Sequence, residues 1–161
     1  MGMPFNADEV FEMAEQIERN GARFYRAAAE KFSEVGQLLL ELAAMEDQHE
    51  KTFAAMRSEL SGTEAEPLVF DPDGQAQLYL QAMADEHIFN IKSDPVNQLG
   101  NLDTPDEVLK MAMGMERDSI AFYAGLKESV SRKAGKDKVE AIIKEEISHI
   151  AILSQKMEAL K

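Results

Sequence analysis

Apolar residues recur at three- and four-residue steps through most of this chain, which is the pattern of helices that bury one face. Asn6 as N-cap, with Glu9 completing a capping box, predicts a helix from residue 7 to about residue 31. A short turn over residues 32–36 separates this helix from a second apolar stripe. Because so short a connection makes consecutive helices antiparallel neighbours, residues 6–60 are expected to form a helical hairpin.

A second hairpin is predicted over residues 104–161. Thr104 as N-cap, with Glu107 closing a capping box, begins its first helix. The apolar pattern breaks near Gly135, and Asp137 restarts it for the last helix of the chain. The connection is again short, so these two helices are also expected to be antiparallel neighbours.

The hairpins are joined by a long connection over residues 61–103, in which residues 75 to about 91 have helical spacing and the stretch is closed by Ser93-Asp94-Pro95 and Gly100. The apolar residues of the expected helix are Leu78, Tyr79, Ala82, Met83, Phe89 and Ile91. A chain of 161 residues fits one domain, 1–161. The predicted fold is all-α, a four-helix bundle of two helical hairpins with a long crossover containing an additional helix.

One polar pattern occurs in both predicted hairpins. A lone glutamate is followed about 28 residues later by Glu-x-x-His, and the six residues concerned are Glu18, Glu46, His49, Glu116, Glu146 and His149. On a helix, residues i and i+3 project from one face about a turn apart, so each Glu-x-x-His can direct two ligands at one site. The chemistry to expect is a pair of metal ions.

Each lone glutamate is followed seven residues later by a tyrosine on the same helical face, Tyr25 after Glu18 and Tyr123 after Glu116. The functional interpretation is that each phenol donates a hydrogen bond to a ligating glutamate of the other hairpin and fixes its orientation. The alternative is a core aromatic ring with its hydroxyl at the surface. The two halves align at offsets of 98 and 100 residues, which indicates a duplicated hairpin with one short insertion.

The motif glutamates lie next to apolar positions rather than on the opposite helical face. Burying four unpaired carboxylates costs on the order of several kcal/mol for each ion. Either these residues face solvent, or something neutralises them, and two divalent cations would balance the charge of four carboxylates. Carboxylate oxygens with one imidazole per ion suit Fe(II) or Mn(II), so two iron ions are the first choice and manganese or zinc the alternatives.

On these motifs the chain resembles the rubrerythrin-like di-iron carboxylate proteins of the ferritin-like superfamily, and the resemblance covers the four long helices. It implies a di-iron oxidoreductase that reacts with peroxide or O₂ using an external electron donor such as rubredoxin. The six motif residues would then be the catalytic metal centre itself. Each ion would have one terminal glutamate and one histidine, with two bridging glutamates between the ions: Glu18 and His49; Glu116 and His149; Glu46 and Glu146.

Two features depart from full-length rubrerythrins. Those proteins end in a Cys₄ rubredoxin domain, whereas this chain has no cysteine, and their extra carboxylate one turn after the second lone glutamate is replaced here by Ser119, which mirrors Gly21. Two other functions therefore stay open: a ferroxidase or iron-handling protein without sustained turnover, and a structural protein that holds zinc or manganese. Gly21 and Ser119 are interpreted as allowing close helix packing, with room for a small oxidant as the alternative.

The charge and the missing cysteines exclude several other classes. With 17 basic and 30 acidic residues the formal charge is −13, which would repel nucleic acid and anionic membranes. The absence of cysteine excludes disulfides, zinc ribbons and iron–sulfur clusters. No apolar run approaches the ~18 residues that span a bilayer, and no signal-peptide pattern opens the chain, so we expect a cytoplasmic protein.

Three features fall outside the proposed site. His87, in the predicted crossover helix, is interpreted as a solvated or interface histidine. The ten methionines are interpreted as core filler. A crossover helix with an apolar face and no hairpin partner favours a homodimer.

Overall fold

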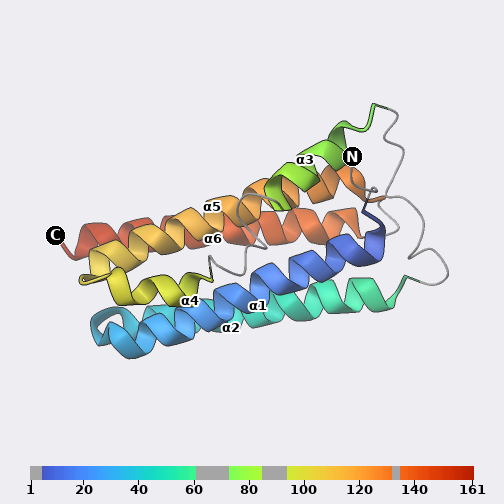
Figure 1. Cartoon of the computed structure of the whole chain (residues 1–161). Coiled ribbons are helices and arrows are strands. Elements are labelled where there is room, and N and C mark those ends of the chain that lie inside the picture. Colours follow the sequence, from blue (N-terminus) through green and yellow to red (C-terminus); the bar gives the residue numbers. More distant parts are fainter. Residues whose placement is uncertain (1–4, 61–72, 85–93, 132–134) are drawn as a thin grey trace.

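The structure is a computed structural model that describes residues 5–60, 73–84, 94–131 and 135–161. Four long helices lie side by side (Figure 1): α1 (Ala7–Lys31), α2 (Gly36–Ser58), α5 (Pro105–Ser129) and α6 (Lys136–Ala159). The shorter elements are the helices α3 (Gln75–Met83) and α4 (Pro95–Gln98) and the 3₁₀ turns η1 (Ser33–Val35) and η4 (Leu99–Asn101). Within the described residues, no helix combines the length and the apolar character needed to cross a membrane.

The four long helices form the two predicted hairpins. Helix α1 packs along α2, and α5 packs along α6. The hairpins meet where α1 contacts α5 and where α2 contacts α6. Helix α2 ends at the opposite end of the bundle from the start of α5 (Figure 1), so the chain between them must return along the whole bundle. The all-α four-helix bundle with a long crossover is therefore confirmed.

The N-terminal caps of α1 and α5 differ in one detail. The Asn6 side chain accepts a hydrogen bond from the Glu9 amide, and the Glu9 carboxylate accepts one from the Asn6 amide, so the predicted capping box is closed. Thr104 likewise accepts a hydrogen bond from the Glu107 amide. The Glu107 carboxylate, however, accepts from the amide of Asp103 rather than from that of Thr104. The second predicted box is therefore only half formed.

Helix α6 begins before the residue that the sequence indicated. Gly135 is its N-cap, in a left-handed conformation with φ of 114°, and its carbonyl accepts hydrogen bonds from the amides of Lys138 and Val139. Asp137 lies in the first turn and does not start the helix, so that prediction was wrong. A side chain at position 135 would be strained by the backbone, and its Cβ would lie 2.6 Å from Cε of Met56.

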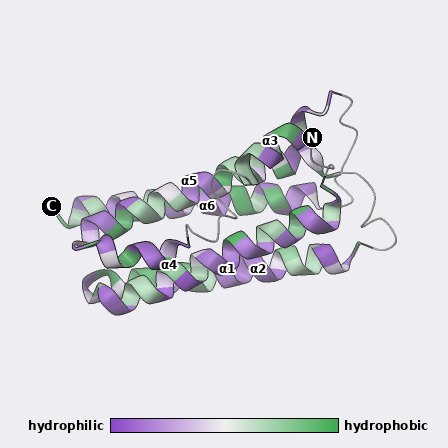
Figure 2. Cartoon of the chain, viewed as in Figure 1, coloured by the Kyte–Doolittle hydropathy of each residue, from purple (hydrophilic) through white to green (hydrophobic). Residues whose placement is uncertain are grey.

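The apolar stripes of the long helices meet in two core clusters, and each helix carries both apolar and polar residues (Figure 2). Buried residues of one cluster include Phe24, Ala28, Leu39, Leu42, Val108, Leu109, Ala112 and Leu153. Buried residues of the other include Val10, Phe11, Ala14, Phe53, Leu80, Phe122, Leu126, Val139 and Ile142. On every long helix the motif glutamate lies between residues of the two clusters, as Glu18 does between Ala14 and Phe24. The core is therefore apolar toward both ends and polar in the middle.

Helix α3 packs against α5 by a face that the sequence did not single out. Leu78 and Tyr79 were predicted among its apolar residues, but Leu78 is 65% exposed and Tyr79 is also exposed. The buried residue is Leu80, at 0% exposure. A short helix with consecutive apolar residues has no unique apolar face, so contact with α5 decides which one is buried. Gly125 allows the approach, because a Cβ there would lie 2.4 Å from the Tyr79 ring.

The end of the crossover forms a short helix, α4, followed by the turn η4. Asp94 caps α4 by accepting a hydrogen bond from the amide of Val96, and it also accepts one from Arg23 of α1 at 3.1 Å. Helix α4 lies against α1 and leads through η4 toward α5. The predicted continuation of the crossover helix to residue 91, including His87, lies outside the described residues.

Replacing Leu80 with Ala should destabilise the protein by about 2–5 kcal/mol, because it removes a fully buried side chain from the apolar cluster between α3 and α5. Urea unfolding of the metal-free protein measures this change. Leu78→Ala is the matched control on the same helix, and its effect should stay within about 0.5 kcal/mol because Leu78 is exposed. Equal effects of the two substitutions would show that α3 does not dock in this way.

Candidate metal centre

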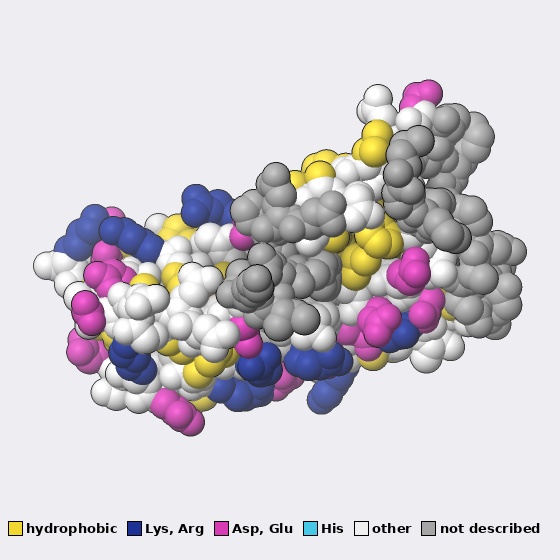
Figure 3. Space-filling view, viewed as in Figure 1, with side chains coloured by type: hydrophobic (Ala, Val, Ile, Leu, Met, Phe, Trp, Pro, Cys, Tyr) yellow, Lys and Arg dark blue, Asp and Glu magenta, His cyan; other side chains and the backbone are white. Residues whose placement is uncertain are grey.

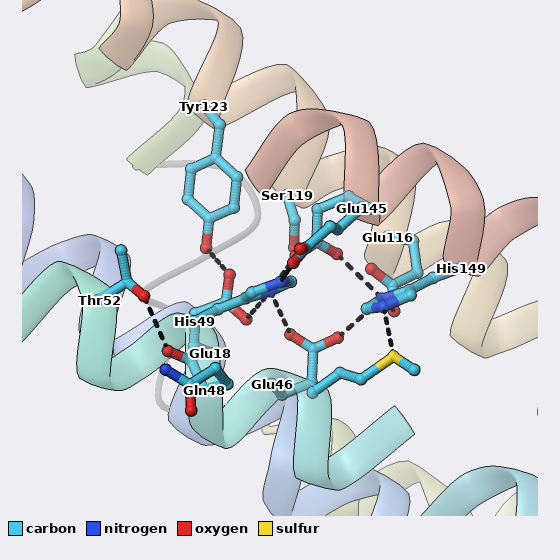
Figure 4. A network of polar contacts seen from close by, with 12 residues as sticks. Glu18, Glu46, Gln48, His49, Thr52, Glu116, Ser119, Tyr123, Glu145 and His149 are labelled. Atoms are coloured by element: carbon cyan, nitrogen blue, oxygen red, sulfur yellow. Dashed lines mark hydrogen bonds and ion pairs between the residues drawn. The ribbon is translucent and has the colours of Figure 1, made fainter. Parts of the chain in front are cut away.

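All six motif residues are buried in the middle of the bundle, each with an exposed fraction of 4% or less, and Figure 4 labels five of them: Glu18, Glu46, His49, Glu116 and His149. Helices α1 and α5 each supply one glutamate, and α2 and α6 each supply a glutamate and a histidine: Glu18, Glu116, Glu46, His49, Glu146 and His149. No histidine is visible among the coloured residues on the face of the molecule in Figure 3. The alternative that these carboxylates face solvent is therefore wrong.

The side chains form two overlapping groups of candidate ligands. Within each group, one ligand atom from every residue lies within 4.8 Å of the others. The groups are Glu18, Glu46, His49 and Glu146, and Glu46, Glu116, Glu146 and His149. They share two glutamates, one from α2 and one from α6.

The two shared glutamates each reach toward both histidines. For Glu146, Oε1 lies 2.8 Å from Nδ1 of His49, and Oε2 lies 3.6 Å from Nδ1 of His149. For Glu46, Oε2 lies 3.7 Å from Nδ1 of His49, and Oε1 lies 3.4 Å from Nδ1 of His149. The imidazole rings are nearly parallel, at 16°, with centroids 5.7 Å apart. Each shared carboxylate thus has one oxygen on either side of the centre, as a ligand bridging two ions requires.

The lone glutamates complete the two sides. Oε2 of Glu18 lies 3.4 Å from Nδ1 of His49, and Oε1 of Glu116 lies 3.4 Å from Nδ1 of His149. Each histidine therefore lies close to one of the two lone glutamates. That these residues bind metal stays a prediction.

Several of these buried atoms make ion-pair contacts within the cluster but no aligned hydrogen bond among the described residues: Oε2 of Glu18, both carboxylate oxygens of Glu146, and Nδ1 of His49 and of His149. Leaving so many buried polar atoms without a hydrogen bond is costly. They point toward one another, they are lone-pair donors when deprotonated, and two divalent cations would balance the four carboxylate charges. The donor set therefore fits a pair of metal ions.

The tyrosines connect the hairpins at the centre. The Tyr25 hydroxyl donates a hydrogen bond of 2.5 Å to Oε1 of Glu116. The Tyr123 hydroxyl donates one of 2.5 Å to Oε1 of Glu18, which Figure 4 shows. Both tyrosines are buried, so the alternative of a surface hydroxyl is wrong. Each bond crosses from one hairpin to the other. The bond to Glu18 occupies one oxygen and leaves Oε2 directed at the centre.

Without metal, the centre holds protons. Burial raises the pKa of Glu18 and of Glu116 well above the ordinary value, and the neighbouring negative charges of Glu46 and Glu146 add to this effect. Burial opposes the charged form of His149, but its contacts with Glu116, Glu146 and Glu46 outweigh burial and raise the pKa to about 12. Because ligating groups must be deprotonated, a metal ion that enters has to displace these protons.

Neither Gly21 nor Ser119 adds a ligand. A Cβ at Gly21 would lie 3.6 Å from Cγ and Cδ of Glu46, so this position packs against the side chain of a candidate bridging residue. Ser119 lies beside the cluster (Figure 4), but its hydroxyl donates a 3.1 Å hydrogen bond to the Met115 carbonyl of its own helix. Around the cluster the described ligand set is thus four glutamates and two histidines.

Sequence reasoning missed two residues that touch the centre from outside. The Glu145 carboxylate contacts Nε2 of His49, and Sδ of Met45 lies 3.2 Å from Nε2 of His149. Met45 was predicted to be core filler, but it is 42% exposed, so that interpretation was wrong for this residue. The signal that could have found both is their place immediately before the glutamate of each Glu-x-x-His motif.

A four-helix bundle with one long crossover, with a glutamate on two helices and Glu-x-x-His on the other two, defines the class of ferritin-like carboxylate proteins that hold paired metal ions. The family model for rubrerythrin matches residues 9–157, and the chain belongs to the rubrerythrin family. This membership and the buried Glu/His cluster fit di-iron binding.

One solved structure has the same fold over its whole length. It is the crystal structure of a Thermotoga maritima protein proposed to be a ferritin-like diiron-carboxylate protein. The two chains are 23% identical and superpose with a TM-score of 0.72, covering 100% of each chain. A search of curated proteins gave no match.

Replacing Tyr123 with Phe should weaken metal binding about 10–100-fold, because Glu18 loses the hydrogen bond that orients it. Competition with a metal chelator measures the affinity. Tyr79→Phe is the control, since the Tyr79 hydroxyl donates to the Ala121 carbonyl and not to the cluster. If Tyr123→Phe bound metal as tightly as the control, the phenol would only fill space.

Proposed function

We propose that this protein holds two iron ions in the centre and is a di-iron oxidoreductase that reduces peroxide or O₂ with electrons from an external donor. One observation carries the proposal: Glu46 and Glu146 each direct one carboxylate oxygen toward each of the two histidines. In this proposal these two glutamates bridge the ions. The terminal ligands are Glu18 and His49 for one ion and Glu116 and His149 for the other.

The donor chemistry supports iron. Carboxylate oxygens with one imidazole per ion suit Fe(II) or Mn(II) better than ions that prefer thiolates. When bound, a pair of Fe(II) ions supplies two electrons together to O₂ or H₂O₂, and a donor such as rubredoxin restores them.

The protein contributes orientation and exclusion of water. Tyr25 and Tyr123 hold the terminal glutamates from across the bundle, so the ligands are positioned before an ion arrives. The two apolar clusters enclose the centre along the bundle axis. An apolar surrounding strengthens the attraction between the carboxylates and a cation.

A ferroxidase or iron-handling protein without sustained turnover is the second candidate, and Ser119 is the observation that favours it. Its hydroxyl is bonded within α5, and it stands where rubrerythrins are expected to carry an extra carboxylate. The third candidate is a structural centre that holds zinc or manganese, which would use the same ligands without redox chemistry.

Anaerobic loading with Fe(II) tests these candidates. We expect two irons per chain, oxidised faster by H₂O₂ than by O₂, with peroxide consumption continuing when reduced rubredoxin is supplied. Bound iron is counted first, and the near-ultraviolet absorption of the oxidised pair is then followed with each oxidant in separate runs. One round of Fe(II) oxidation that then stalls would favour the second candidate, and the lack of a stoichiometric iron pair would favour the third.

Replacing Glu46 with Ala should abolish formation of the iron pair, because each ion loses a shared ligand. Iron counted per chain after anaerobic loading and gel filtration measures the effect. Glu41→Ala is the matched control, since Glu41 is an exposed glutamate of the same helix. A Glu46→Ala variant that still loads two irons and oxidises them normally would refute the bridging assignment.

A further inference from the structure

The residue before each motif glutamate breaks the symmetry of the centre. Positions 45 and 145 correspond, because the two Glu-x-x-His motifs are offset by 100 residues. Both side chains cross to the opposite hairpin. The Glu145 carboxylate of α6 contacts Nε2 of His49 (Figure 4), and Sδ of Met45 of α2 lies 3.2 Å from Nε2 of His149. Equivalent positions therefore meet equivalent histidines with different chemistry.

The nitrogen that carries the proton in each imidazole ring follows from which nitrogen faces the centre. Nδ1 of His49 and Nδ1 of His149 both point toward the carboxylates of the cluster. An imidazole that offers its Nδ1 lone pair to a cation carries its proton on Nε2. The outer nitrogen is then a donor in both rings. His49 donates to the carboxylate of Glu145, which is a strong charged acceptor, whereas His149 donates to a thioether, which is a weak one.

The outer acceptor of a ligating histidine affects how well that histidine binds. A carboxylate there fixes the tautomer and the orientation of the ring and makes the ligating nitrogen more basic. Glu145 also adds a negative charge on the His49 side only. The inner ligands are matched between the two sides, one terminal glutamate each and two shared. The two metal positions therefore have equivalent inner ligands and differ in the residue that contacts Nε2 of the histidine.

We propose that Glu145 is a positioning residue that makes the two metal positions unequal. A divalent cation binds more tightly at the Glu18 and His49 position than at the Glu116 and His149 position, where Nε2 of the histidine contacts Sδ of Met45. The tighter position fills first. This inference rests on the proposed metal centre and adds to it an order of occupation.

Both residues can be exchanged without opening the core. The Glu145 side chain is 61% exposed, and Met45 is 42% exposed. Each can therefore be given the residue of its counterpart, as Glu145→Met and Met45→Glu. Both variants should still unfold cooperatively without metal, and their unfolding midpoints separate an effect on metal binding from a loss of the fold.

Anaerobic titration of the metal-free protein with Co(II), followed by visible absorption and equilibrium dialysis, gives the two stepwise affinities. Two binding steps in the wild type do not by themselves show that the two positions differ, because two cations that share bridging ligands also repel each other. Glu145→Met should lower the affinity of the first step about 10–100-fold, and Met45→Glu should raise that of the second step. Both changes should reduce the difference in affinity between the two binding steps. Glu140→Met, at an exposed glutamate of the same helix, should leave both steps unchanged.

Removing one histidine at a time locates the tighter position. His149→Ala should keep the tighter event, and His49→Ala should lose it. The inference would be overturned if the two histidine variants lost the tighter Co(II) binding event equally. It would also be overturned if neither Glu145→Met nor Met45→Glu reduced the difference between the two stepwise affinities. Either result would leave a two-ion centre in place. A wild-type protein that binds fewer than two Co(II) ions would overturn both the inference and the proposed centre.

Discussion

The burial of four carboxylates and two imidazoles in the middle of a helical bundle is the constraint on which the rest of the structure depends. Such charges are tolerated away from water only when they are paired, protonated or bound to a cation. Each long helix therefore places apolar residues on either side of its motif glutamate, so the two clusters stabilise the bundle toward its ends while the middle stays polar. The tyrosine hydroxyls then donate to one oxygen of Glu18 and of Glu116, and in Glu18 the other oxygen is left without a hydrogen bond at the centre.

The parts that could be predicted from the sequence are those that a single helix determines. Glu46 and His49 share a face because they are three residues apart, and Tyr25 follows Glu18 by two turns, so both placements follow from helical geometry alone. The contact of Glu145 with His49 could not be predicted in this way, because it depends on how far α6 is shifted along α2. The burial of Leu80 depends in the same way on where α3 meets α5.

The two hairpins are alike in their ligands and differ in the residues around them. Identical glutamates and histidines would by themselves build two equal positions, and the repeat indicates that a duplication produced them. The residues that differ are neighbours of the ligands: Met45 corresponds to Glu145, and Gly21 corresponds to Ser119. A site built from a repeated unit can thus keep its ligand set while the surrounding residues distinguish its halves.

The polar bonds at the centre also bear on how the two halves of the chain depend on each other. Four side chains each contact a residue of the opposite hairpin: Tyr25, Tyr123, Glu145 and Met45. None of these four, and none of the six motif residues, comes from the crossover. Among the described residues of the crossover, α3 packs on α5 and α4 lies against α1, so their contacts are made away from the centre. By joining the hairpins covalently, the crossover also raises the effective concentration of each half around the other, while the polar groups that meet at the centre come from the hairpins themselves.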